Sequence, residues 1–232
     1  MNNTDEYLDL YKQLEQFAIK RFGYPDDGKA VSSLEKRPEF RKVKTELQYC
    51  REVRNLLQHK PKIEKSFAVA PSEEMISFLK NTIHKVKNPP KAKDIAIPIA
   101  SILYKTMDDF VKPTMVEMQK KVYTHVPILQ DGIVVGVFSE NTVFSYLIDE
   151  EIVGIEDQMR FRELEDYLPV DKHSSESFRF ARQDMLVENI NLLFEKALAK
   201  QDRIGLVFIT KNGKADEPLL GIITAWDIAG YR

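Results

Sequence analysis

Three polar residues near the middle of the first half, Arg54, Asn55 and His59, have types that could cleave RNA without a metal. Such cleavage needs a base that deprotonates the ribose 2′-hydroxyl and a cation for the charge that builds on phosphorus. His59 is the candidate base, Arg54 the candidate cation, and Asn55 could orient the phosphate or His59. The alternative is a surface arginine beside a helix-terminal histidine that the helix dipole stabilises.

The spacing of these residues sets a condition on the site. Five residues of continuous helix place Arg54 and His59 about 140° apart around the helix axis, which is not one face. The two side chains share a site only if the helix ends near His59, as Pro61 indicates, or if a second subunit completes it.

A second chemical pattern ends the chain, Gly221-Ile222-Ile223-Thr224-Ala225-Trp226-Asp227. A threonine hydroxyl at the start of a helix can meet a phosphate, helped by free backbone N–H groups. An aspartate three residues later can accept hydrogen bonds from two ribose hydroxyls. Helix capping alone would also explain Thr224 and Asp227, because both types favour a helix start.

Other chemical signals are absent from the sequence. It has no glycine-rich phosphate loop and no Cys/His metal spacing, so we expect no metal and no required cofactor. His84, His125 and His173 are isolated along the chain, and we expect them at the surface or at a pocket rim. Cys50 is the single cysteine, which excludes an intrachain disulfide.

Composition predicts a globular protein with a real core, since 43% of the 232 residues are hydrophobic and 30% are charged. The net charge of -2 argues against a globally basic nucleic-acid binder. A basic excess over 36–65 is either a solvated helix face or a footprint for an anionic partner such as RNA. The sequence shows no secretory signal pattern, and its longest apolar stretch, 95–104, is too short to span a bilayer. We therefore expect a cytoplasmic protein and no membrane partner.

The elements that position these residues follow from hydrophobic periodicity. A period near 3.6 predicts helices over 5–22, with Thr4 as the N-cap, over 38–59, and from Ser72 to Lys85. A proline pair inside 87–91 then places a domain boundary near residue 90.

After residue 90 two stretches share one pattern of strand, turn, strand and helix. Their glycines, Gly136 and Gly221, lie 221 minus 136, or 85, residues apart. Their turns, Asp131-Gly132 and Asn212-Gly213, lie 213 minus 132, or 81, residues apart, and four inserted loop residues account for the difference. Each stretch is also preceded by a predicted helix, over 112–122 and 186–200. Matching spacing and turn chemistry indicate an internal duplication.

This duplication resembles a pair of CBS domains, or Bateman module, over 91–232. The family's repeats end in Gly-hydrophobic-hydrophobic-Thr/Ser-x-x-Asp, and the second repeat has this segment in full, whereas the first has Thr142 where the acid should be. The resemblance implies an adenine nucleotide ligand, AMP, ADP or ATP, with Thr224 on phosphate and Asp227 on ribose. It further places these residues at the two sites: Phe180, Ala181, Arg203, Ile204 and Gly205 in the second repeat, and Ser139, Thr142, His125 and Val126 in the less complete first.

The run from Arg54 to His59 reads Arg-Asn-x-x-x-His, which resembles the signature of the HEPN superfamily. These small helical domains often act as metal-independent ribonucleases and usually pair as dimers with their motifs facing. The resemblance implies a HEPN-like domain over 1–90 and a homodimer.

The sequence therefore predicts an α+β protein, with a helical domain at 1–90 and β-α-β-β-α repeats at 91–152 and 153–232. We expect a regulatory protein whose CBS pair senses an adenine nucleotide and controls a dimeric helical domain. One alternative is a nucleotide-gated ribonuclease that acts on RNA. A second is a structural dimer or adaptor with empty CBS sites.

Overall fold

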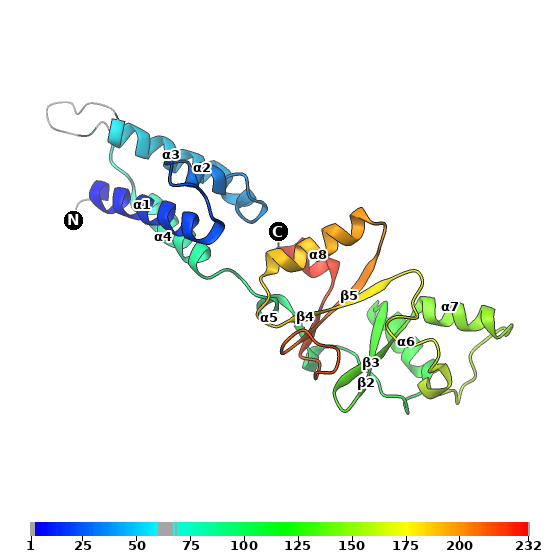
Figure 1. Ribbon diagram of the computed structural model, residues 1–232. Helices are drawn as coiled ribbons and strands as arrows, with labels where there is room; N and C mark the ends of the chain where they lie inside the picture. Colours follow the sequence, from blue (N-terminus) through cyan, green and yellow to red (C-terminus); the bar gives the residue numbers. More distant parts are fainter. Residues whose placement is uncertain (1–2, 60–66, 68, 232) are drawn as a thin grey trace. The chain divides into compact units, whose positions relative to one another are not determined.

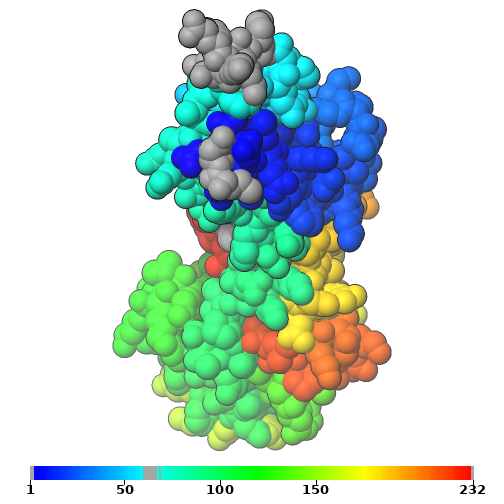
Figure 2. Space-filling view, turned by 90° about the vertical axis from the view of Figure 1, so that its left-hand side faces the viewer, coloured from blue at the N-terminus to red at the C-terminus, as the bar shows by residue number. Residues whose placement is uncertain are grey.

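The computed structural model describes residues 3–59, 67 and 69–231. The chain divides into two compact units, residues 1–90 and 91–231, which are coloured blue to cyan and green to red in Figure 2. The fold class is α+β, because the first unit is helical and the second mixes helices with two sheets (Figure 1). No helix among the described residues is both long and apolar enough to cross a membrane.

The first unit contains the three predicted helices, of which the one predicted over 38–59 begins as a 3-10 helix, and one short helix that the sequence analysis did not predict. Its elements are α1 (Asn3–Phe22), α2 (Ala30–Leu34), the 3-10 helix η1 (Pro38–Val43), α3 (Lys44–His59) and α4 (Glu73–Lys87). Ser72 caps α4 by accepting a hydrogen bond from the Met75 N–H. The assignment of Thr4 as N-cap was wrong, because α1 already includes Asn3 and Thr4 lies buried inside it.

Buried polar contacts fix how the helices of the first unit pack. The Tyr7 hydroxyl on α1 donates to the Cys50 carbonyl on α3 at 2.6 Å. Burial raises the pKa of Tyr7, so this hydroxyl stays a donor. Arg51 on α3 donates to Glu35, just beyond α2, at 2.9 Å. These contacts hold α3 against both neighbours, and α3 is the helix that carries Arg54 and His59.

The second unit contains two halves in sequence. The first half has α5 (Ala92–Ile95), β1 (Ile97–Pro98), η2 (Ile99–Ser101), α6 (Val111–Lys121), β2 (His125–Gln130), β3 (Ile133–Ser139) and α7 (Glu140–Asp149). The second has η3 (Phe161–Leu164), β4 (Ser177–Arg182), α8 (Val187–Ala199), β5 (Ile204–Thr210), β6 (Gly221–Ile223) and α9 (Ala225–Tyr231).

Both halves follow the β-α-β-β-α order that the duplication predicts. In the second half β4 pairs parallel with β5, and β5 pairs antiparallel with β6. In the first half β2 and β3 form a hairpin whose turn holds Asp131 and Gly132 at positive φ. The opening strand of this half is reduced to one parallel bridge between Lys105 and Ile128.

The segment that opens each half packs on the other half. Residues 91–98 pair with the second half, where β1 extends its sheet in the order β1-β6-β5-β4. Residues 159–168 pack on the first half, where the Val137 N–H donates to the Leu168 carbonyl at 2.8 Å. Each half is therefore completed by the segment that leads into its partner.

The two glycines that mark the repeat lie at the closest points of these exchanged contacts. A Cβ atom on Gly136 would lie 2.7 Å from the Leu168 carbonyl oxygen, and one on Gly221 would lie 2.5 Å from the Ile97 carbonyl oxygen. Any larger residue would push the incoming backbone away. The two glycines, 85 residues apart, therefore make equivalent close contacts, each with the backbone of an exchanged segment.

Candidate functional sites

Thr224 and Asp227 lie together at the junction of β6 and α9. The Thr224 N–H and hydroxyl both donate to Asp227 Oδ2 at 2.7 Å, and the Asp227 N–H points back to Thr224 Oγ1 at 3.4 Å. Both residues are half-buried. These contacts form a reciprocal cap, so a ligand that takes Asp227 must compete with the start of α9.

The other residues predicted for the second repeat come from β5, which pairs with β6, and from β4 on the far side of β5. Phe180 and Ala181 lie on β4, and Ile204 and Gly205 begin β5, which pairs directly with β4. Ala181 and Ile204 belong to the hydrophobic core of this half, whereas Arg203 is exposed just before β5. The structure therefore places the whole predicted set on or beside three adjacent strands.

The corresponding first-repeat residues are enclosed. Ser139 caps α7, and its N–H donates to Thr142 Oγ1 at 3.0 Å. Both side chains are 2% exposed, and Val126 beside them on β2 is fully buried. Thr142 therefore replaces the expected acid with a hydroxyl that faces the protein interior.

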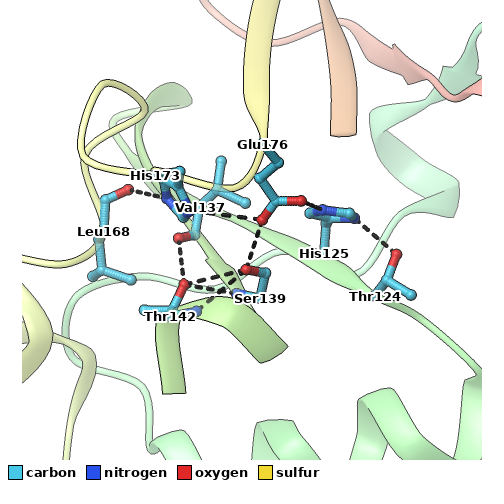
Figure 3. Close-up of polar contacts among 8 residues, drawn as sticks. All are labelled: Thr124, His125, Val137, Ser139, Thr142, Leu168, His173 and Glu176. Carbon is cyan, nitrogen blue, oxygen red and sulfur yellow. Dashed lines mark hydrogen bonds and ion pairs between the residues drawn. The ribbon is translucent and has the colours of Figure 1, made fainter. Parts of the chain in front are cut away.

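A buried carboxylate meets Ser139 from the second half of the unit (Figure 3). Glu176 lies directly before β4, its side chain is 1% exposed, and it accepts a hydrogen bond from the Ser139 hydroxyl at 2.9 Å. His125 Nε2 lies 2.6 Å from the other carboxylate oxygen, and His173 Nδ1 lies 3.7 Å from the first. We call Glu176, His125, His173 and Ser139 the Glu176 cluster.

The cluster corrects one expectation drawn from the sequence and adds a residue that the sequence analysis missed. His125 and His173 are not isolated at the surface, because they converge on one carboxylate and their side chains are 9% and 2% exposed. Glu176 was missed altogether. It lies 51 residues from His125 in a serine-rich stretch without periodicity, so no local signal pointed to it.

The electrostatics of the cluster make Glu176 an internal anion. Burial alone raises the pKa of this carboxyl, but hydrogen bonds from His125, His173 and Ser139 outweigh burial and hold its pKa well below the usual range. The carboxylate contacts the N-cap residue of α7, where a helix favours negative charge. The first-repeat position that resemblance assigned to a ligand is thus already engaged by an anion of the chain.

Arg54, Asn55 and His59 are brought together at the end of α3. Arg54 Nη1 lies 3.2 Å from Asn55 Oδ1 and 3.4 Å from His59 Nε2. A guanidinium only donates, so Nε2 of His59 is the acceptor and carries the lone pair that a base requires. The two side chains are therefore in contact, and His59 is the last described residue of α3. The expected helix end and Pro61, cited as its reason, lie outside the described residues.

Glu15 on α1 faces the same guanidinium. Arg54 Nη2 and Glu15 Oε2 are 4.0 Å apart, and their side chains are largely buried. Burial raises the pKa of Glu15, with Arg54 acting in the opposite direction. Glu15 Oε1 and Arg54 Nε are buried with no hydrogen-bond partner among the described residues, so Arg54 is only partly neutralised.

Among the described residues, no group of three or more His, Cys, Asp or Glu side chains is arranged to hold a metal ion.

Comparison with known proteins gives matches at the level of solved structures. No family model matches, and no curated protein matches. The protein AcuB from Vibrio cholerae is 15% identical, with a TM-score of 0.45 over 62% of this chain and 90% of that one. CBSX2 in complex with AMP is 16% identical, with a TM-score of 0.42 over 60% of this chain and 93% of that one.

The CBS domain pair of protein MJ0100, in complex with 5′-methylthioadenosine and S-adenosyl-L-methionine, is also 16% identical. Its TM-score is 0.42 over 62% of this chain and 95% of that one.

Proposed function

We propose that residues 91–152 and 153–232 form a CBS pair that binds an adenine nucleotide, AMP, ADP or ATP, in its second repeat. The observation that carries this proposal is the difference between the β3–α7 junction of the first half and the equivalent β6–α9 junction of the second half. The Thr224–Asp227 cap is half-buried and open to competition, whereas Ser139 and Thr142 are enclosed with Glu176. We therefore assign the nucleotide to the second of the two junctions.

In this proposal each residue of the second repeat has a defined task. Asp227 accepts the ribose hydroxyls, and the Thr224 hydroxyl turns from Asp227 to a phosphate oxygen. Phe180 and Ala181 form the apolar wall for the adenine ring, with Ile204 and Gly205 on the adjacent strand. Exposed Arg203 supplies a cation at the start of that strand.

Ligand binding of this kind changes the start of α9, because Thr224 and Asp227 cap that helix in the free protein. A nucleotide that prefers one arrangement of the cap shifts the population of the second unit towards it. We propose that this shift regulates the first unit, a HEPN-like domain that pairs in a homodimer.

The nucleotide proposal is tested by thermal melting of the full chain with AMP, ADP and ATP. A ligand at about 100 times its dissociation constant adds about 2.7 kcal/mol, so we expect a rise of several degrees. Asp227→Ala should abolish the rise, and Asp227→Asn, which keeps an acceptor for the cap, should reduce it. Asp216→Ala, an exposed aspartate in the loop before β6, is the matched control and should leave it intact.

Each melt is compared with the same variant without nucleotide, because Asp227→Ala also removes a helix cap. The proposal is wrong if no adenine nucleotide raises the melting temperature, or if the rise is the same in Asp227→Ala as in the unaltered chain.

A second candidate function is metal-independent cleavage of RNA by the first unit. The 3.4 Å approach of Arg54 to His59 at the end of α3 favours it, since base and cation then share one site. His59 would take the proton of the ribose 2′-hydroxyl, and Arg54 would stabilise the negative charge on the phosphate. Asn55 would hold the guanidinium in place.

For this candidate we expect RNA cleavage in the presence of EDTA. His59→Ala should reduce the rate at least about 100-fold, the lower range for loss of a general base. His84→Ala, at an exposed histidine on α4, is the matched control and should cleave normally. Cleavage that survives both His59→Ala and Arg54→Ala would show that the Arg54 group is not the site.

A further inference from the structure

We propose that Ser139, His125 and His173 form an anion-binding cage in the first repeat, with the Glu176 carboxylate as its tethered ligand. A free small carboxylate such as acetate takes the same place when the side chain of Glu176 is shortened. Neither nucleotide binding in the second repeat nor RNA cleavage is required for this role.

Both oxygens of the Glu176 carboxylate face side chains that converge on it (Figure 3). The Ser139 hydroxyl donates to Oε1 at 2.9 Å, and His125 Nε2 lies 2.6 Å from Oε2. His173 Nδ1 faces Oε1 at 3.7 Å. Ser139 is also the N-cap of α7, a helix of ten residues, and a helix start favours negative charge. A free carboxylate would meet the same groups in the same arrangement.

The cage is closed to solvent. The side chains of Glu176, His173 and His125 are 1%, 2% and 9% exposed. Both imidazole rings pack edge-on against Phe178 on β4, at centroid distances of 5.9 Å for His125 and 4.9 Å for His173. A Cβ on Gly205 of β5 would lie 2.9 Å from His125 Nε2, so β5 closes another side. Loss of the carboxylate would therefore leave buried groups without their acceptor, which favours the entry of another anion.

The second repeat supplies the equivalent carboxylate from its own helix. There the Thr224 hydroxyl donates to Asp227 Oδ2 at 2.7 Å, three residues along the chain. The first repeat has Thr142 at the corresponding position, and its Ser139 hydroxyl donates to Glu176 instead. In each junction the cap hydroxyl therefore meets a carboxylate, and in the first repeat this carboxylate comes from the other half.

The register of the strands identifies the position in the first half that corresponds to Glu176. Lys105 and Ala181 are equivalent, because each forms a parallel pair with an isoleucine that lies opposite the glycine of its repeat. Glu176 lies 181 minus 176, or five, residues before Ala181, and the residue five before Lys105 is Ala100. The duplicated chain thus has a carboxylate at this position in one half and a methyl group in the other.

The cage selects a full negative charge. Burial acts to raise the pKa of Glu176, but the hydrogen bonds of the cluster overcome it and hold the pKa well below the usual range. Acetate matches the CH₂–COO⁻ group that Glu176→Ala removes in both size and charge. Acetamide has nearly the same shape without the charge, so it separates recognition of an anion from filling of a cavity.

The test is thermal melting of the full-length Glu176→Ala chain at about pH 7, where acetate is ionised, in sodium acetate and in sodium chloride of equal ionic strength. Acetate should raise the melting temperature by about 2–4 °C above chloride, the shift of one regained contact in a unit of this size. Acetamide added to the chloride buffer should give no such rise. The unaltered chain should show no difference between the two salts, because Glu176 already fills the cage.

Glu165→Ala, at an exposed glutamate in the same connecting segment, is the matched control and should also show no difference between the salts. An equal rise in Glu165→Ala and Glu176→Ala would mean that acetate acts on the whole chain, and the proposal would be wrong. Equal melting of Glu176→Ala in acetate and chloride would refute it as well. If Glu176→Ala is unfolded in chloride, the same comparison is read as recovery of the circular dichroism signal in acetate.

A second experiment supplies the carboxylate from within α7. Thr142→Asp, which places an acid where the second repeat has Asp227, should raise the melting temperature of Glu176→Ala and remove its response to acetate. In the unaltered chain Thr142→Asp should lower the melting temperature, because two buried carboxylates would then meet at one hydroxyl. Equal effects of Thr142→Asp in both backgrounds would overturn the proposal, since the two acids would not share one place.

Discussion

Replacing Glu176 by alanine should lower the free energy of unfolding of the second unit by about 3 kcal/mol, the range for breaking a buried charge pair by removing one partner. The change leaves the Ser139 hydroxyl and the inward nitrogens of His125 and His173 buried without their common acceptor. Urea denaturation at pH 6, followed by circular dichroism, measures the loss as a lower midpoint.

Two variants separate charge from packing in this experiment. Glu176→Gln keeps the shape and one acceptor oxygen but removes the negative charge, so we expect a smaller loss than for alanine. Glu165→Ala, at an exposed glutamate in the same connecting segment, should change stability by less than about 0.5 kcal/mol. If Glu176→Ala were as stable as Glu165→Ala, the carboxylate would not be the tie that its contacts indicate.

The second large effect is expected at the glycines of the exchanged contacts. Gly221→Ala places a Cβ atom 2.5 Å from the Ile97 carbonyl oxygen, where only backbone can move. Either β1 separates from β6 or the strand distorts, and we expect a loss of about 2–3 kcal/mol. Gly136→Ala should behave alike, because its Cβ would lie 2.7 Å from the Leu168 carbonyl oxygen.

Gly154→Ala is the matched control for the glycine variants, since an added Cβ there meets no atom within 4 Å. It should leave the urea midpoint nearly unchanged. A Gly221→Ala protein as stable as Gly154→Ala would mean that β1 does not pack on β6 in solution.

Elements with a periodic or local signal could be predicted from the sequence. The 3.6 period over 5–22 predicted α1, and serine followed by two acids predicted the start of α4 at Ser72. The spacing of the glycines and turns, which agrees apart from four inserted residues, predicted the repeated β-α-β-β-α order. The 3-10 turn η1, within the predicted 38–59 helix, and the short α2 carry too few residues for a period to show.

Contacts between distant segments could not be predicted in this way. Nothing in the sequence of 91–98 or 159–168 indicates that these segments pack on the opposite half. The glycines that they contact were nevertheless recognised as part of the repeat. The Glu176 cluster joins positions 51 residues apart, and isolated histidines gave no reason to link them.

The candidate sites also differ in whether local spacing predicts them. Thr224 and Asp227 are three residues apart, so their mutual contact followed from helix geometry. Arg54 and His59 are in contact although five residues of helix separate them by about 140°, so their spacing alone did not predict this approach. The nucleotide and RNA assignments remain predictions, because they concern molecules that these local rules do not describe.

The exchanged segments also determine how small a part of the second unit could fold on its own. A chain cut between the halves would deprive the first of 159–168 and leave β6 of the second as an open edge, because β1 would be lost with the first. Neither fragment would be a finished domain. Because both halves lie on one chain, each completing segment is held near the half that it completes, and the contact forms within one molecule rather than between two.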